Sequence, residues 1–157
     1  MLPPIVKSVW LDCSPDRAFE LFTSHIDKWW PLASHSISAG QGQIPADVQF
    51  EPYEGGRLYE TAPDGSVHVW GSIAIWEPGS ALRFSWHVGR TPDQATQIDV
   101  AFKSADQGGT LITLTHSNWE ALGSEAADQH ANYTPGWDQV FVQGFGAYAQ
   151  KNLTATG

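Results

Sequence analysis

The sequence has little of three things: cysteine, basic residues and long apolar runs. A single cysteine, Cys13, cannot form a disulfide within the chain, and the first residues lack the basic start and apolar stretch of a signal peptide. No apolar run approaches the roughly 20 residues that a membrane-spanning helix requires. We therefore expect a cytoplasmic protein without membrane insertion.

The scarcity of basic residues also limits the partners. Eight Lys and Arg residues stand against 17 Asp and Glu residues, so the formal net charge is −9. Binding to nucleic acid regardless of its sequence requires clustered basic side chains that displace counterions from phosphates. The composition therefore excludes nucleic acid as the expected partner.

Familiar catalytic and cofactor motifs are missing as well. The chain has no nucleophile elbow, phosphate-binding loop, dinucleotide fingerprint or paired Cys-x-x-Cys, and its six histidines are scattered without metal-ligand spacing. We expect neither a metal nor a cofactor.

What the chain has in abundance is aromatic bulk. Eight Trp, seven Phe and four Tyr occur among 157 residues, of which 41% are apolar and only 16% charged. This composition excludes disorder, and the length suits one domain with a sizeable core. We expect a single domain over residues 1–157.

The first third of the chain predicts a strand, two helices and a loop. Ser14 and Pro15 are typical of a helix start, because the serine caps the first turn and a proline at the first helical position loses no hydrogen bond. Pro31 ends the helical pattern, and the segment after it is rich in Ser, Gly and Gln. We expect a strand at 7–12, a helix at 15–23, a short helical piece up to 30, and a loop at 31–45 that is a candidate lid.

From Val48 onward, short runs of β-branched and aromatic residues alternate with turn clusters. Leu82, Phe84 and Trp86 share one face of an expected strand, so one face of the sheet is apolar. We expect further strands at 48–53, 57–62, 67–76, 82–88, 96–103 and 110–118, which with the first strand give about seven antiparallel strands.

The last element is expected to be a long helix that covers this apolar face. Thr134 and Pro135 again indicate a helix start, and from Trp137 the apolar residues recur at helical spacing to about Asn152. Gly144 and Gly146 inside it each cost about 1 kcal/mol relative to alanine. Close approach to the sheet or to a ligand would compensate.

These elements in this order resemble an α+β helix-grip fold. The strings 55–60, 70–78 and 114–119, together with the tryptophan pair 29–30, are similar to the bacterial single-domain branch of the family named after the activator of the HSP-90 chaperone's ATPase. That family belongs to the START-like (SRPBCC) superfamily, with the polyketide cyclases. The resemblance implies a curved antiparallel sheet of about seven strands around a long C-terminal helix, with an internal cavity. It also implies lipid, hormone or polyketide ligands, and in some members cyclisation or hydrolysis.

His116 is the first candidate for chemistry. Ile112 and Leu114 form the apolar set of the last strand, and a period of two sends His116 to the same inner face. There the imidazole could hydrogen-bond a ligand or act as a general base near neutral pH. The alternative, which is commoner, is a core histidine bonded to backbone.

Glu60 is the second candidate. Glu60 lies two residues after Leu58, so both side chains face the same side of the strand. If that side is the interior, burial would favour the protonated form of Glu60, which suits a general acid or a hydrogen-bond anchor for a ligand. In the opposite register Tyr59 faces inward and Glu60 is a surface charge. The pattern leaves both open.

The aromatic side chains suggest the walls of a ligand cavity, although each could simply be core. With the two polar candidates, the expected ligand-binding residues are Trp29, Trp30, Phe50, Glu60, Trp70, Trp86, Phe102, His116, Trp119, Trp137, Phe141 and Phe145.

Three functions remain open. The first is a carrier or sensor for a small hydrophobic molecule, favoured by aromatic bulk without an organised catalytic set. The second is a cyclase or hydrolase that acts on a hydrophobic carbonyl compound through His116 or Glu60. The third is a protein-interaction module, since the family name implies a chaperone partner that the residues themselves do not support. A homodimer is compatible with each.

Overall fold

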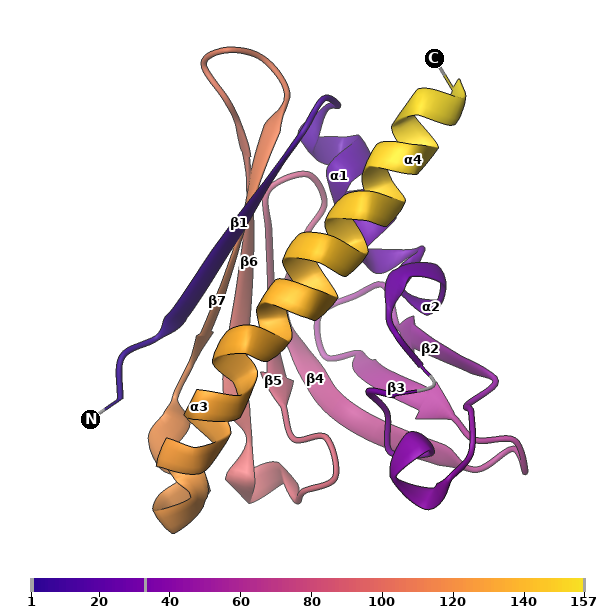
Figure 1. Ribbon diagram of the computed structural model, residues 1–157, viewed down its shortest axis with the longest axis vertical. Helices are drawn as coiled ribbons and strands as arrows, with labels where there is room; N and C mark the ends of the chain where they lie inside the picture. The colour runs from indigo at the N-terminus through magenta and orange to yellow at the C-terminus, as the bar shows by residue number, and fades with distance from the viewer. Residues whose placement is uncertain (1, 33, 157) are drawn as a thin grey trace.

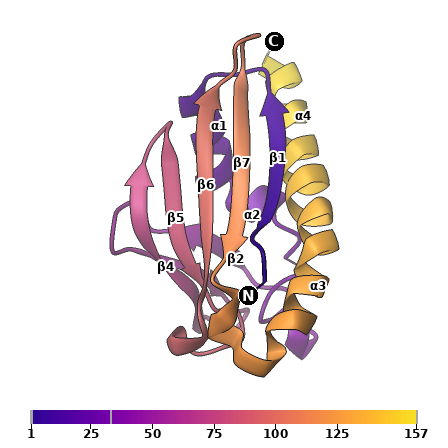
Figure 2. The ribbon, with the colours of Figure 1, turned by 90° about the vertical axis from the view of Figure 1, so that its left-hand side faces the viewer.

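The computed structural model describes residues 2–32 and 34–156, so Ala33 of the expected loop lies outside the described residues. Seven antiparallel strands form one sheet in the order β1-β7-β6-β5-β4-β3-β2. The sheet curls, and its concave face is crossed by the long C-terminal helical run (Figures 1 and 2). This is the helix-grip fold that the sequence predicts. The strands are β1 Ile5–Leu11, β2 Asp47–Phe50, β3 Arg57–Thr61, β4 Val67–Glu77, β5 Ala81–Trp86, β6 Thr96–Ser104 and β7 Thr110–Ser117.

Alternation within the strands places the core. In β5, Leu82, Phe84 and Trp86 are buried, and Phe84 lies opposite Ile98 of β6. Their intervening neighbours are partly exposed. The concave face therefore carries the apolar side chains, and the helices cover it.

A bulge in β4 directs Trp70 into this core. Leu58 of β3 pairs with Gly71 and Tyr59 pairs with Val69, so Trp70 is the extra residue of β4. A Cβ added at Gly71 would lie 1.7 Å from the carbonyl oxygen of Ser85, which explains why glycine follows the tryptophan. The bulge and this close approach together hold the Trp70 indole fully buried.

Two short helices follow β1, as expected. Helix α1 spans Pro15–Thr23, and the Ser14 hydroxyl caps it by accepting a hydrogen bond from the Arg17 amide at 3.2 Å. Helix α2 spans Ile26–Trp29, and its last turn is closed by the Trp30 amide, which donates to the Ile26 carbonyl.

The predicted start of the last helix at Thr134 and Pro135 is wrong. A 3-10 turn at Trp119–Glu125 leads into α3, Ala126–Trp137, which continues through a π-helical stretch at Asp138–Phe145 into α4, Gly146–Thr156. Pro135 is exposed, so the backbone carbonyl that lacks a partner because proline has no N–H can face water. The Thr134 hydroxyl donates to the His130 carbonyl at 2.8 Å, a bond that threonine commonly makes inside a helix. Among the described residues, no helix is long and apolar enough to cross a membrane.

The two glycines of this run have different surroundings. A Cβ added at Gly144 would lie 3.2 Å from the Gln139 carbonyl oxygen in the π-helical stretch and 3.7 Å from that of Trp29. One added at Gly146 would lie 3.7 Å from a methyl group of Val9, which is an ordinary contact. Close approach within the helix and to the end of α2 thus accounts for Gly144.

This contrast predicts opposite effects of two matched substitutions. Gly146→Ala is expected to raise the free energy of unfolding by about 0.5–1 kcal/mol, because alanine favours the helix and has room. Gly144→Ala is expected to lower it by about 1 kcal/mol, because the crowded methyl group outweighs that gain. Urea denaturation of both variants checks this, and equal stabilisation by both would contradict it.

Candidate functional site

A pocket of about 220 Å³ lies where the end of β5, helix α3 and the loop after α2 meet. The loop supplies polar groups at its outer edge, and the strand and helix supply aromatic and aliphatic walls. The pocket is lined by Trp30, Ser34, His35, Ser36, Trp86, Val88, Tyr133, Gly136, Trp137 and Val140.

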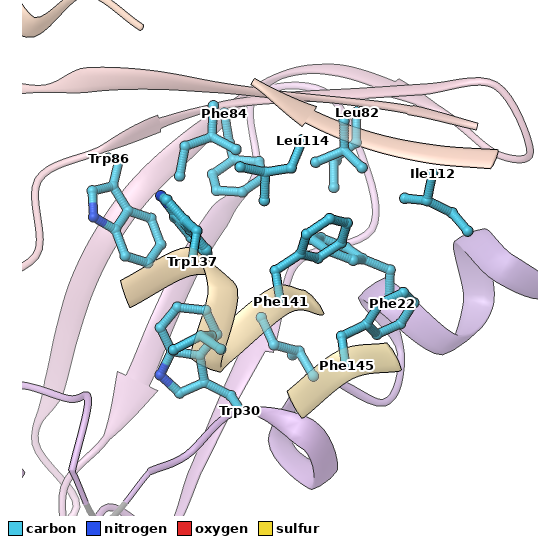
Figure 3. Packing of buried hydrophobic residues seen from close by; sticks show 14 of the residues in the cluster. Phe22, Trp30, Leu82, Phe84, Trp86, Ile112, Leu114, Trp137, Phe141 and Phe145 are labelled. Atoms are coloured by element: carbon cyan, nitrogen blue, oxygen red, sulfur yellow. The ribbon is translucent and has the colours of Figure 1, made fainter. Parts of the chain in front are cut away.

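Three indoles from distant parts of the chain form its apolar wall. Trp30 follows α2, Trp86 ends β5 and Trp137 ends α3, and their ring centroids lie 5.6–6.0 Å apart in all three pairs. Figure 3 shows the three rings close together beside the C-terminal helical run. Each is at most 8% exposed.

The N–H group of each wall indole is already used within the protein. Trp30 donates to the His35 carbonyl at 2.6 Å, and Trp86 donates to the Tyr133 hydroxyl at 2.9 Å. Trp137 donates to Nδ1 of His116 at 3.0 Å. These bonds fix the rings in place. A ligand in the pocket would therefore contact the carbon atoms of the indoles and not their N–H groups.

Glu60 anchors the loop that forms the outer edge of the pocket. Its Oε1 accepts hydrogen bonds from the Ile37 amide at 2.6 Å and the Trp70 indole at 2.7 Å. Its Oε2 accepts from the Ser38 amide at 3.0 Å and the Ser38 hydroxyl at 2.7 Å. One buried carboxylate thus joins the loop to β3 and β4.

The side chain of Glu60 therefore points inward with Leu58, while Tyr59 faces outward and donates to Gln49. Burial by itself would raise the pKa of Glu60, but the hydrogen bonds from Ser38, Ile37 and Trp70 together hold that pKa below its usual value. The expectation that burial favours the protonated acid is wrong, because four donors stabilise the carboxylate.

His116 is fully buried, and both of its ring nitrogens are bonded to side chains. Nδ1 accepts from Trp137, so Nε2 carries the proton and donates to the Thr96 hydroxyl at 2.7 Å. The Thr96 hydroxyl in turn donates to the Trp86 carbonyl at 3.2 Å. Burial lowers the pKa of His116 to about 3, with a smaller contribution from His130, so the ring is neutral at neutral pH.

Of the twelve aromatic and polar side chains expected to bind ligand, three line the pocket: Trp30, Trp86 and Trp137. Glu60 and His116 lie behind it and hold its parts in place. Trp70 packs against Trp30 and Trp86, at 5.2 and 5.4 Å between ring centroids.

The remaining predicted residues lie in other aromatic clusters. Trp119 packs against His116 with 4.2 Å between ring centroids. The others surround Phe22 of α1, which makes ring contacts with each of them at 5.1–6.3 Å; they are Trp29, Phe50, Phe102, Phe141 and Phe145. This second group fills the space between sheet and helix as core.

Sequence reasoning missed Tyr133, Gly136 and the loop residues 34–36 as pocket residues. A signal for Tyr133 existed, because it precedes Trp137 by four residues and so shares its helix face. Placing the helix start at Thr134 hid that relation. Among the described residues, no three His, Cys, Asp or Glu side chains gather as a metal site.

The profile described as Activator of Hsp90 ATPase homolog 1-like protein matches residues 12–150. The chain belongs to this family. A comparison with curated proteins gave no match.

Three solved structures are similar to this chain. A structure described as the anthrahydroquino-gamma-pyrone synthase Txn09 complexed with SUM is 36% identical, with 82% of this chain and 85% of that chain covered and a TM-score of 0.57. The self-sacrificing resistance protein CalC from Micromonospora echinospora is 22% identical, with 96% of each chain covered and a TM-score of 0.67. The Aha1 dimer from Colwellia psychrerythraea is 17% identical, with 90% of this chain and 92% of that chain covered and a TM-score of 0.63. The last two show the shared fold.

Proposed function

We propose that this protein binds a small, mainly apolar aromatic molecule between Trp30, Trp86 and Trp137. The observation that carries the proposal is a pocket whose three indoles turn carbon surface to the ligand because their N–H groups bond to the protein. At about 220 Å³ the pocket is smaller than the roughly 300–1,000 Å³ typical of sites for drug-sized ligands. A ligand of about two fused rings suits it.

A substitution that fills the pocket tests this proposal. A Cβ added at Gly136 meets no atom within 4 Å, so the backbone there accepts a side chain. Gly136→Leu places such a side chain at the pocket wall, in a residue type that favours helix. We expect the wild type to bind a two-ring aromatic compound with 1:1 stoichiometry in calorimetry, and Gly136→Leu to bind it at least tenfold more weakly.

Gly146→Ala is the matched control, because it replaces a glycine of the same helical run on the side facing Val9. Its affinity is expected to equal that of the wild type. Failure of the wild type to bind any two-ring aromatic compound, or unchanged binding by a folded Gly136→Leu protein, would refute the proposal. Native mass spectrometry of the purified protein, followed by extraction, identifies any co-purifying ligand.

An enzyme of the cyclase kind is the second candidate, favoured by the 36% identity to Txn09, which is described as a synthase. In that case the groups that line the pocket and can transfer protons are Tyr133 and His35, since His116 and Glu60 lie behind its wall. Incubation with the co-purified ligand separates the two functions. A carrier returns the ligand unchanged, whereas an enzyme yields a product that mass spectrometry detects.

A homodimer and a cytoplasmic location stay predictions, and a chaperone partner stays only what the family name implies. The Colwellia relative is described as a dimer. Size-exclusion chromatography with light scattering tests the homodimer for this chain.

A further inference from the structure

The hydroxyl of Tyr133 differs from the three indole N–H groups of the pocket wall. The indole N–H groups of Trp30, Trp86 and Trp137 all end on protein acceptors, and that of Trp86 ends on the Tyr133 hydroxyl oxygen at 2.9 Å. Among the described residues, this hydroxyl makes no other hydrogen bond, so its own proton has no protein acceptor. A hydrogen-bond donor is therefore available between the aromatic and aliphatic side chains of the pocket wall, apart from the loop residues Ser34, His35 and Ser36 at the outer edge.

The Tyr133 ring is held in place by its aromatic neighbours. It is inclined by 30° to the Trp137 ring, with 6.2 Å between centroids, and it meets His116 edge-on at 5.0 Å. Trp119 packs against it at 5.6 Å. Burial raises the pKa of Tyr133, so the phenol keeps its proton at neutral pH. The donor is thus protonated and preorganised, and little conformational entropy is lost when a ligand accepts from it.

The bond from Trp86 also decides what Tyr133 can recognise. Because the indole occupies an acceptor position of the hydroxyl oxygen, the capacity that remains is chiefly donation. Donation by Trp86 into this oxygen polarises the O–H group and makes it a better donor. The matching ligand group is an acceptor without a proton of its own, such as a carbonyl oxygen.

Building on the proposed function, we propose that Tyr133 selects aromatic ketones by donating a hydrogen bond to their carbonyl oxygen. A hydrocarbon of the same shape fills the pocket but leaves the hydroxyl unpaired. Tyr133 is then the residue that determines specificity, and the three indoles supply affinity for the rings.

Two ligands of nearly equal shape test this inference. 1-Indanone carries a ring carbonyl and indane does not, and calorimetry measures both against the wild type and Tyr133→Phe. We expect the wild type to bind 1-indanone about tenfold more tightly than indane, since the ketone gains a hydrogen bond from a donor that indane leaves unpaired. Tyr133→Phe is expected to lower the affinity for 1-indanone about tenfold and to change the affinity for indane less than twofold.

Tyr148→Phe is the matched control. Its hydroxyl bonds to His25 at 2.7 Å, further along the same helical run and outside the pocket, so both affinities should stay unchanged. The carbonyl stretch of bound 1-indanone offers a second readout. It is expected at lower frequency in the wild type than in Tyr133→Phe, because only the wild type donates to the oxygen.

The outcomes distinguish ligand binding in the pocket from the selection of ketones by Tyr133. If indane binds the wild type and 1-indanone binds no more tightly, the inference fails while the proposed function stands. Equal weakening of both ligands by Tyr133→Phe also overturns it, because the hydroxyl then acts only through its bond to Trp86. If neither compound binds the wild type, the proposed function fails and the inference falls with it.

Discussion

Glu60→Gln is expected to lower the free energy of unfolding by about 3 kcal/mol. The carboxylate accepts four hydrogen bonds, two at each oxygen, from groups of Ile37, Ser38 and Trp70. A glutamine amide has one oxygen, so its NH₂ group must face donors at the other position. At least one buried donor then loses its acceptor, and the charge that strengthened the other bonds is gone. Chemical denaturation measures the loss.

The same substitution is expected to release the loop over the pocket. Hydrogen exchange at the Ile37 and Ser38 amides should become faster, because their acceptor is weakened. Glu77→Gln, at an exposed residue of β4, is the control for the chemical change and should leave stability within about 0.5 kcal/mol of the wild type. A Glu60→Gln protein as stable as this control would show that the carboxylate does not anchor the loop.

Acidification from pH 7 to pH 5 is expected to cost about 2 kcal/mol of stability through His116 alone. Its pKa falls from the usual 6.5 to about 3 in the folded protein. In this interval His116 therefore binds a proton in the unfolded chain but stays neutral in the folded protein. The stabilising contribution is complete above pH 6.5 and is lost progressively as the pH falls toward 3. Glu60, whose pKa is held below its usual value, keeps its charge over this interval.

A variant without the titrating ring provides the comparison. His116→Gln is expected to be less stable than the wild type at pH 7, because Trp137 and Thr96 lose well-placed partners, but to lose less stability between pH 7 and pH 5. Parallel losses in both proteins would show that His116 does not carry this dependence. Nitrogen NMR of the imidazole should report one neutral tautomer, with the proton on Nε2, throughout the interval.

Local patterns were sufficient to predict the strands and the faces of their side chains. The alternation of Leu82, Phe84 and Trp86 and the turn residues between strands follow from the period of two and from backbone geometry, which act within a few residues. Parity likewise directed His116 inward, and it left only two choices for Glu60. The start of the last helix was mispredicted because Thr134 and Pro135 resemble a cap, whereas an exposed proline is tolerated within a helix that packing stabilises.

Such local patterns could not predict which residues line the pocket. Trp30, Trp86 and Trp137 meet only because the sheet curls and the last helical run crosses it, and Phe141 and Phe145 from the same helix instead fill the core around Phe22. Periodicity states which way a side chain faces, but hydrogen-bond partners far along the chain depend on how the elements cross. The partners of His116 and the donors that keep Glu60 ionised were therefore decided by the packing of distant segments.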